Sequence, residues 1–348
     1  MKPFESVDDE IIVFISFEKT VNSRTKTYFD GLIELGCKCY WYEIRSKSIF
    51  RDMFRIVKNL NTRRCSFVVS SPSHLLVPYV FLVTKKMPFF DLGWPLVDGV
   101  ITSRKNYGVL KLNLIKTIFI DFISIIFSKI VFVESRYQLN RLGKVFFFFK
   151  EKFVLLPTGF SESRFDNNID GLYDPLRKVI LFRGGDLPEA GIDVLISAIR
   201  INTNKSIRFV IISRSSRLKY LNLPNTEVFT DYLTDEEVGK LYASASVVLG
   251  QLSSHKRTNW TIPHKFYEAA YLGIPYITSN SAPMIEFESI NCVKLFNGGD
   301  SLDLIKTIDW LVNNSSEMKI LGSNISQLYN KNFNQQLLSK IFLSYINK

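Results

Sequence analysis

The sequence predicts an α/β protein made of two Rossmann-like domains, each with a doubly wound parallel sheet. Two observations carry this prediction: short β-rich runs alternate with helical patterns, and the alternation starts twice. The first series opens with IIVFISF at residues 11–17, and the second opens with KVILFRGG after Pro175. A chain of 348 residues is long enough for two domains with a substantial core in each.

The first series continues with a helix that Gly36 ends, and then with strands within residues 37–44 and 65–71. Residues 112–133 form the longest apolar segment. Its polar residues recur every three to five positions, which predicts a largely buried helix followed by a strand. Residues 144–153, KVFFFFKEKF, favour a buried strand edge. Contact with lipid is the alternative for this segment.

The boundary between the two series lies in residues 157–175, which are rich in Gly, Asn, Asp and Ser as linkers are. We therefore expect an N-terminal Rossmann-like domain at 1–158 and a C-terminal Rossmann-like domain at 175–325. Residues 326–348 are expected to form a C-terminal helix that packs back toward the N-terminal domain.

The formal net charge of +11 calls for an anionic partner or a lysine-rich solvated surface. No zinc finger, RNP motif or basic heptad indicates nucleic acid, whereas anionic lipid headgroups remain candidates. The N-terminus has no apolar secretory segment, and four scattered cysteines suit neither a disulfide framework nor a zinc site. These features favour a cytoplasmic protein, with peripheral contact on the inner face of the membrane as an option.

The segment PHKFYEAAYLGIPYIT, residues 263–278, predicts a short helix before a strand. Pro263 suits the first helical position, with Thr261 or Ile262 as the cap. Gly273 is expected to end the helix in the left-handed conformation, and Pro275 prevents its continuation.

Lys265 and Glu268 lie at i, i+3 in this helix and so share a face. The helix N-terminus, together with Lys265, is suited to a phosphate or diphosphate. Glu268 lies about 4.5 Å further along the axis, which suits the two hydroxyls of an adjoining ribose. The alternative is a simple salt bridge on a solvated face, and the helix alone does not decide between them.

Four ordered blocks between Val154 and Pro275 resemble the group 1 (family 4-like) glycosyltransferases with the GT-B fold, in which two such domains face a cleft. PHKFYEAAYLGIPYIT looks like that family's P-x-K-x-x-E block, and LLPTGFSESRF looks like its inter-domain signature. The blocks beginning at Val179 and Val228 resemble the start of its second domain and a later E-L-x-x-x-Y stretch. The first half matches only in pattern.

The resemblance implies a metal-independent glycosyltransferase whose nucleotide-sugar donor, UDP- or GDP-linked, is a substrate, with no cofactor. It places Glu268 on the ribose, Lys265 with the helix N-terminus on the diphosphate, and the backbone at Tyr232 and Leu233 on the base. Thr234 and Glu237 fit a capping box for the following helix. The donor-binding residues that we expect are His264, Lys265, Glu268, Arg183, Gly184, Gly185, Arg214, Tyr232, Leu233, Trp260 and Thr261.

The sequence departs from the family where the family has its phosphate-binding cations, because Gly185 and Ala190 occupy those positions. Arg183 or Arg214 is expected to supply the charge from nearby, and the backbone of Gly184 and Gly185 to approach a phosphate. Trp260 replaces the family's first motif glutamate. This pattern also resembles inverting GT-B enzymes of the glucuronosyltransferase kind, so the stereochemical outcome stays open.

The acceptor side is expected around MPFFDLGWPLVDG in the first half. Asp91 follows an apolar strand and would lie at its carboxyl end, where a general base is needed; Asp98 is the second candidate. Ordinary turn chemistry explains both aspartates equally well. Trp94 is a candidate for stacking on a sugar, and Asn22, Ser23 and Arg24 are candidates for acceptor contact or for capping a helix.

The expected function is sugar transfer to a saccharide or polyprenyl-linked acceptor, in the synthesis of a bacterial surface polysaccharide such as O-antigen, capsule or exopolysaccharide. Two alternatives remain: a sugar-nucleotide epimerase of the same fold, and a non-catalytic scaffold subunit. Binding of nucleoside diphosphate and turnover of the donor separate the three.

Overall fold

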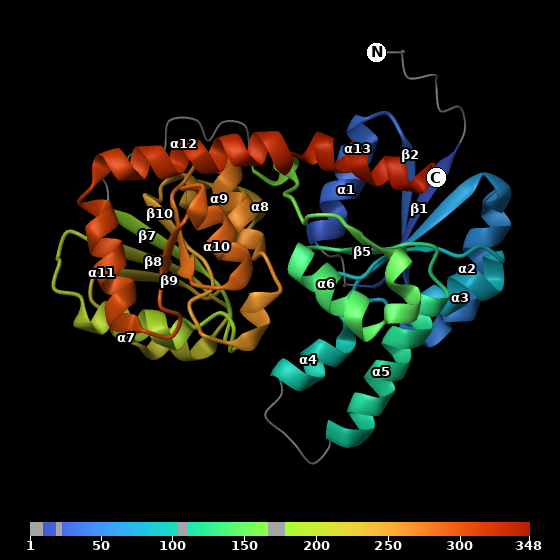
Figure 1. Cartoon of the computed structure of the whole chain (residues 1–348), viewed down its shortest axis with the longest axis horizontal. Helices are drawn as coiled ribbons and strands as arrows, with labels where there is room; N and C mark the ends of the chain where they lie inside the picture. Colours follow the sequence, from blue (N-terminus) through green and yellow to red (C-terminus); the bar gives the residue numbers. More distant parts are fainter. Residues whose placement is uncertain (1–9, 19–22, 104–109, 166–177) are drawn as a thin grey trace. The chain divides into compact units, whose positions relative to one another are not determined.

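The computed structural model describes residues 10–18, 23–103, 110–165 and 178–348. The chain divides into two compact units. Unit 1 comprises residues 1–161 together with 335–348, and unit 2 comprises residues 162–334. Each unit is built on its own six-stranded parallel sheet covered by helices (Figure 1). The predicted fold class, two Rossmann-like α/β domains, is confirmed.

Unit 1 has the strand order β2-β1-β3-β4-β5-β6, and every pairing in it is parallel. Its strands are β1 (Ile11–Phe17), β2 (Lys38–Ile44), β3 (Cys65–Ser70), β4 (Phe89–Asp91), β5 (Val131–Val133) and β6 (Phe153–Leu155). Its helices are α1 (Ser23–Glu34), α2 (Ile49–Asn59), α3 (Leu76–Thr84), α4 (Leu96–Ser103), α5 (Leu110–Ile126), α6 (Arg136–Val145) and α13 (Gln335–Ile346), with 3-10 turns η1 (Ser46–Ser48), η2 (Thr62–Arg64) and η3 (Phe147–Lys152).

The last helix of the chain, α13, completes one face of the unit 1 core. Its residues Leu338 and Phe342 are buried in the same cluster as Phe14 and Tyr28. The ring of Phe342 stacks on Tyr28 with a centroid separation of 5.3 Å. The two ends of the chain therefore share one core. Without the other, each would leave an apolar face in contact with water.

Unit 2 has the strand order β12-β11-β10-β7-β8-β9. Its strands are β7 (Val179–Arg183), β8 (Arg208–Ile212), β9 (Thr226–Phe229), β10 (Val247–Leu249), β11 (Tyr276–Ser279) and β12 (Lys294–Phe296). Its helices are α7 (Ile192–Ile201), α8 (Asp235–Ala243), α9 (His264–Leu272), α10 (Ala282–Ser289), α11 (Ser301–Val312) and α12 (Ser315–Asn332), with 3-10 turns η4 (Glu162–Arg164), η6 (Ser216–Tyr220) and η7 (Lys256–Asn259).

Two helices of unit 2 have the ends that the sequence predicts. Thr234 and Glu237 form the expected capping box at the start of α8. Gly273 ends α9 in the left-handed conformation, with φ of 67°. The start of α9 was predicted one residue too early, because Pro263 is itself the N-cap, with extended ψ of 140°, and the helix begins at His264.

Three sequence predictions about elements are corrected. Residues 144–153 are not a strand edge: Phe146 follows α6, the next three phenylalanines lie in η3, and only Phe153 begins strand β6. The helix within residues 112–133 is present as α5, but one of its faces is exposed, with Phe119 63 % accessible. The C-terminal segment is not one helix, since α12 ends at Asn332 and α13 starts at Gln335. Among the described residues, no helix has the length and the apolar run needed to cross a bilayer.

Candidate functional site

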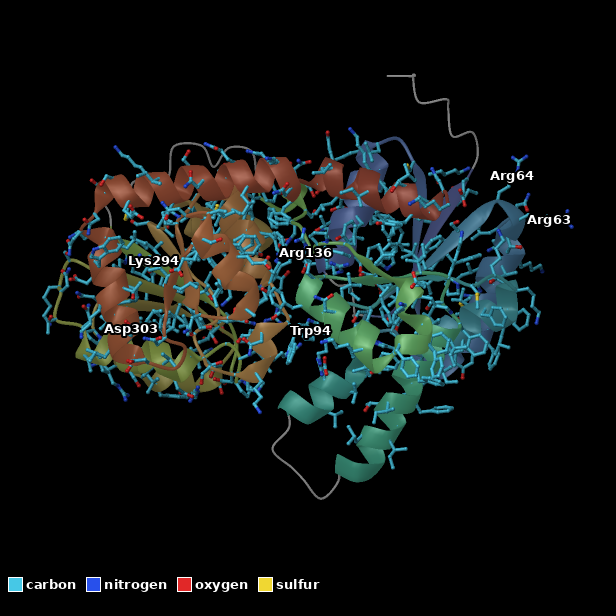
Figure 2. The ribbon with its side chains drawn as sticks, viewed as in Figure 1. Arg63, Arg64, Trp94, Arg136, Lys294 and Asp303 are labelled. Atoms are coloured by element: carbon cyan, nitrogen blue, oxygen red, sulfur yellow. The ribbon has the colours of Figure 1, made fainter. Side chains whose placement is uncertain are left out.

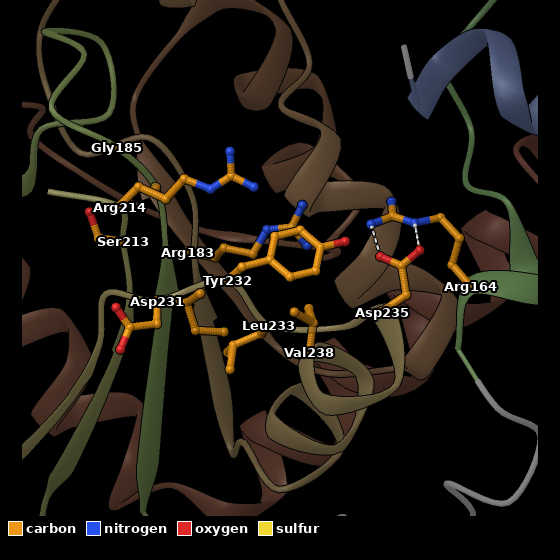
Figure 3. Close-up of a pocket in the computed structure, with 12 residues that line it drawn as sticks. Arg164, Arg183, Gly185, Ser213, Arg214, Asp231, Tyr232, Leu233, Asp235 and Val238 are labelled. Atoms are coloured by element: carbon orange, nitrogen blue, oxygen red, sulfur yellow. Dashed lines mark hydrogen bonds and ion pairs between the residues drawn. The ribbon is translucent and has the colours of Figure 1, made fainter. Parts of the chain in front are cut away.

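A pocket of about 460 Å³ opens in unit 2 where neighbouring parallel strands end (Figure 3). Strands β7, β8 and β9 lie side by side in the sheet, so the residues that follow them meet at one edge. The lining comprises Arg164, Arg183, Gly184, Gly185, Ile212, Ser213, Arg214, Asp231, Tyr232, Leu233, Asp235 and Val238. The structure thus brings together six of the expected donor-binding residues, from Arg183 to Leu233.

The glycine pair after β7 shapes one wall of the pocket. A Cβ atom on Gly184 would lie 2.8 Å from the ring of Phe182, so a side chain at this position would displace a core residue. The backbone N–H of Gly184 donates to Ile212 of β8 at 3.0 Å, so it is already engaged in the sheet. A Cβ on Gly185 would meet nothing within 4 Å, so open space lies beside that residue.

Arg183, the last residue of β7, joins the pocket to the buried interior. Its guanidinium donates to Oε1 of Glu268 at 2.8 Å, and its side chain stays 28 % accessible on the pocket side. Glu268 itself is fully buried on α9. Because the Glu268 charge faces it, the pKa of Arg183 is raised although burial opposes this. Arg183 is therefore a fixed, permanently charged donor that faces the pocket.

Both carboxylate oxygens of Glu268 have partners within the protein. Tyr242 donates its hydroxyl to Oε2 at 2.6 Å, and Nδ1 of His264 lies 3.1 Å from Oε1. Burial alone would raise the pKa of Glu268, but Arg183, His264 and Tyr242 outweigh it and hold that pKa well below its usual range. Glu268 does not line the pocket, so this geometry favours a role in positioning Arg183 over the expected contact with a ribose.

The ammonium group of Lys265 contacts a backbone carbonyl, whereas we expected it to face the donor's diphosphate. Its Nζ donates to the carbonyl of Gly250 at 2.6 Å and lies 4.5 Å from the ring centroid of Phe182. Burial, reinforced by the nearby Arg183, lowers the pKa of Lys265 to about 7. The pocket lining given above does not include this ammonium group. The diphosphate contact expected for Lys265 has no support in this geometry.

Arg214 and the exposed ring of Tyr232 also line the pocket. The guanidinium carbon of Arg214 lies 5.6 Å from the ring centroid of Tyr232, which is 75 % accessible. Figure 3 shows the guanidinium groups of Arg183 and Arg214 and the Tyr232 ring directed into the same space. Such a group of donors with an aromatic plane suits a phosphate joined to a flat ring.

Arg164 is the one arginine of the pocket lining that sequence reasoning missed. It donates to both oxygens of Asp235, at 3.2 and 2.8 Å, and lies 3.5 Å from Oε1 of Glu268. It lies in the segment LLPTGFSESRF, which we interpreted only as a boundary signature. Tyr242 was missed as well, because a buried tyrosine on an amphipathic helix resembles a core residue in sequence. No local signal would have linked either residue to Glu268.

Two of the expected donor-binding residues lie beside η7. Trp260 is half-buried and its backbone N–H donates to Arg257 at 3.2 Å, whereas Thr261 is 5 % accessible. Arg257 in turn pairs with Glu189 at 2.5 Å. The pocket lining does not include Trp260 or Thr261.

In unit 1, Asp91 lies at the carboxyl end of β4 as predicted, but its carboxylate is occupied. Arg24 donates to Oδ1 at 2.7 Å and Thr25 donates to Oδ2 at 2.7 Å. Asp91 is 1 % accessible and Arg24 is 2 % accessible. The pair fixes the start of α1 against β4, so the geometry favours a structural role for both residues over the expected general base and acceptor contact.

The other acceptor-side candidates are also held by the protein. Asp98 accepts from both terminal nitrogens of Arg141, at 2.6 and 2.5 Å, and is 2 % accessible. Trp94, labelled in Figure 2, lies just ahead of α4. Its side chain is half-buried, and His74 contacts its carbonyl at 3.1 Å. Ser23 is the first residue of α1, and Asn22 lies outside the described residues.

Comparison with known families gives a match within unit 2. Residues 177–314 match the family model of the group 1 glycosyl transferases. This chain carries a group 1 glycosyltransferase domain. A comparison with curated proteins finds no match.

Solved structures place this glycosyltransferase domain within a two-domain GT-B fold. HepE from Anabaena, solved with UDP-glucose, covers 97 % of this chain and 99 % of its own at 12 % identity and a TM-score of 0.68. Sucrose-phosphate synthase from Thermosynechococcus elongatus covers 97 % and 98 % at 11 % identity and a TM-score of 0.73. WaaG, a glycosyltransferase involved in lipopolysaccharide biosynthesis, covers 96 % and 99 % at 13 % identity and a TM-score of 0.65.

Proposed function

We propose that this glycosyltransferase takes its sugar from a nucleotide-sugar donor, and that Arg183 and Arg214 hold the donor's diphosphate. One observation carries the proposal: two arginines from neighbouring strand ends point into one pocket of the group 1 domain. The guanidinium fork matches phosphate oxygens, and the carboxyl edge of a parallel sheet is where such folds bind ligands.

These arginines compensate for the two cations that the sequence lacks at Gly185 and Ala190. Arg183 enters the pocket from the strand end two residues before Gly185. The buried Glu268 holds it in place, so its side-chain freedom is already lost before a donor binds. We propose that Glu268 acts through Arg183, as a positioning residue. The open space at Gly185 lets a phosphate approach the backbone closely.

The nucleoside is proposed to lie against Tyr232 and Leu233, beyond the two arginines. HepE has been solved with UDP-glucose, which supports a uridine donor; a GDP-linked sugar is the alternative. The negative charge of the departing diphosphate is then stabilised by arginine side chains. That the reaction needs no metal stays a prediction of the sequence.

The acceptor is proposed to be a saccharide or a polyprenyl-linked saccharide in surface-polysaccharide synthesis. The likeness to WaaG supports this choice of pathway class. A cytoplasmic location follows from the proposed use of nucleotide sugars.

Nucleotide binding is tested by thermal unfolding with UDP or GDP. A ligand at 100 times its Kd stabilises the folded state by about 2.7 kcal/mol, which raises Tm measurably. We expect Arg183→Met and Arg214→Met each to remove most of this rise. Arg208→Met is the matched control, because Arg208 lies at the opposite end of β8 from Arg214 and pairs with Glu227 on the surface.

Equal Tm rises in the wild type and both pocket variants would contradict the diphosphate assignment. Turnover then separates the activities: a transferase releases nucleoside diphosphate only when an acceptor is present. An epimerase would convert the donor without an acceptor, and a scaffold would bind the nucleotide without turnover.

A further inference from the structure

Unit 1 exposes a row of large apolar side chains on α5. Ile115, Ile118, Phe119 and Phe122 are 66, 47, 63 and 41 % accessible. Their spacing of i, i+3, i+4 and i+7 places them on one face of the helix. An exposed apolar stripe of this kind marks a surface that binds something.

The same apolar surface continues into the end of α6 and η3. Val145, Phe147 and Phe148 are 62, 58 and 81 % accessible. Together with the four residues of α5 they form what we call the α5–η3 surface. In Figure 1, α5 extends from the sheet of unit 1 with its C-terminal end beside the segment that follows α6.

Specific contacts hold the two parts of the α5–η3 surface together. The ammonium group of Lys152, at the end of η3, donates to the carbonyls of Ile125, Ile126 and Ser128 at 3.1, 2.6 and 2.8 Å. It thereby caps the C-terminal end of α5. The rings of Phe122 and Phe149 meet edge to face, with centroids 5.9 Å apart. These contacts hold η3, with its exposed phenylalanines, against the C-terminal end of α5.

The charges around this surface have one predominant sign. Of the three acidic residues between positions 114 and 152, Asp121 and Glu134 are buried, and only Glu151 is exposed. Asp121 faces inward, where its carboxylate accepts the backbone N–H groups of Leu96 and Val97 at 3.0 Å each. The exposed cations in the same range are Lys116, Lys129, Arg136, Lys144 and Lys150.

We propose that the α5–η3 surface docks unit 1 on an anionic lipid membrane. The stripe on α5 and the phenylalanines of η3 enter the boundary between headgroups and acyl chains. Lysines such as Lys144 and Lys150 stay at the level of the anionic headgroups. Cations alternate with apolar side chains on this surface, and this favours a membrane over a protein partner. A membrane offers acyl chains to the apolar side chains and anionic headgroups to the cations. The docking is interfacial and does not need a membrane-crossing helix.

The experiment is co-sedimentation of the full chain with two kinds of vesicle. One kind contains phosphatidylcholine alone, and the other contains equal parts of phosphatidylcholine and phosphatidylglycerol. We expect binding to the anionic vesicles that weakens as salt rises. The double variant Phe147→Ser, Phe148→Ser should lose at least about tenfold in affinity, because two exposed rings no longer enter lipid. Lys144→Gln with Lys150→Gln should reduce the salt-sensitive part of the binding.

Tyr220→Ser is the matched control, since Tyr220 of unit 2 is 86 % accessible and lies outside this surface. The double phenylalanine variant should keep the wild-type Tm and its rise with UDP, which separates this proposal from the nucleotide site. Equal binding to both vesicles would overturn the assignment to anionic lipid, and full binding by the double variant would overturn the assignment to this surface. A dimer that the double variant dissociates, with no vesicle binding by the wild type, would overturn the membrane assignment.

Discussion

At the scale of single residues, Glu268 shows how burial and charge compete. A carboxylate without water is destabilised by several kcal/mol unless charges and hydrogen-bond donors surround it. Arg183, Tyr242 and His264 supply them, so the acid stays ionised within the core. Lys265 lies three residues earlier on the same helix, and its pKa falls because it is buried and because Arg183 is nearby. The charge of Arg183 therefore favours the ionised form of one residue of the motif and disfavours that of the other.

Lys265 makes stability depend on pH in a definite direction. Its pKa is about 7 in the folded state and ordinary in the unfolded state, so the unfolded chain binds more protons above pH 7. The free energy of unfolding therefore rises from about pH 7 toward about pH 10, and this contribution is lost as pH falls through 7. Lys265→Met should flatten the rise, measured by urea unfolding across that range. Lys240→Met, on the exposed surface of α8, should leave it unchanged; the same slope in both variants would refute the assignment.

At the scale of elements, helices α1 and α13 of unit 1 pack closely at a glycine of α1. Gly31 of α1 faces α13, and a Cβ there would lie 2.8 Å from Cγ of Gln335 and 3.0 Å from Cβ of Ser339. Both partners are buried, so neither has room to move away. In the sequence this residue is only a glycine within a helical pattern, and by itself such a glycine lowers the stability of a helix.

A pair of glycine substitutions tests this contact. Gly31→Ala should destabilise unit 1 by about 1–3 kcal/mol, because overpacking displaces α13. Gly143→Ala, in α6, should instead stabilise by about 0.5–1 kcal/mol, because its Cβ would lie 3.9 Å from Lys150 in ordinary contact and alanine favours the helix. Urea denaturation measures both. Stabilisation by Gly31→Ala would show that α13 does not pack against α1 this closely.

At the scale of the whole molecule, unit 1 is assembled from both ends of the chain. Unit 1 contains residues 1–161 and residues 335–348. The residues between these two segments, 162–334, form unit 2. The last helix contributes Leu338, Phe342 and Ile346 to the unit 1 core. Stability of unit 1 therefore depends on the final 14 residues, those from Gln335 to Lys348.

Truncation after Asn334 tests this dependence. Each large apolar side chain removed from a core costs about 2–5 kcal/mol, so the loss of three should bring unit 1 close to unfolding. We expect the calorimetric transition of unit 1 to shift down strongly, with rapid proteolysis of residues 10–161. The UDP-dependent stabilisation of unit 2 serves as the internal control. An unchanged transition would mean that α13 is dispensable.

The sequence by itself determined the α/β class, the two series of parallel strands, the capping box of α8 and the left-handed end of α9. These features depend on neighbouring residues, so periodicity and backbone preference predict them. Only the tertiary structure decided which polar groups satisfy one another. Asp91 is held by Arg24, Glu268 by Arg183 and Tyr242, and Lys265 by Gly250. The same holds for the exposed face of α5, since an apolar helix face looks alike in sequence whether protein or solvent covers it. Burial and pairing depend on contacts between distant segments, and no local pattern encodes them.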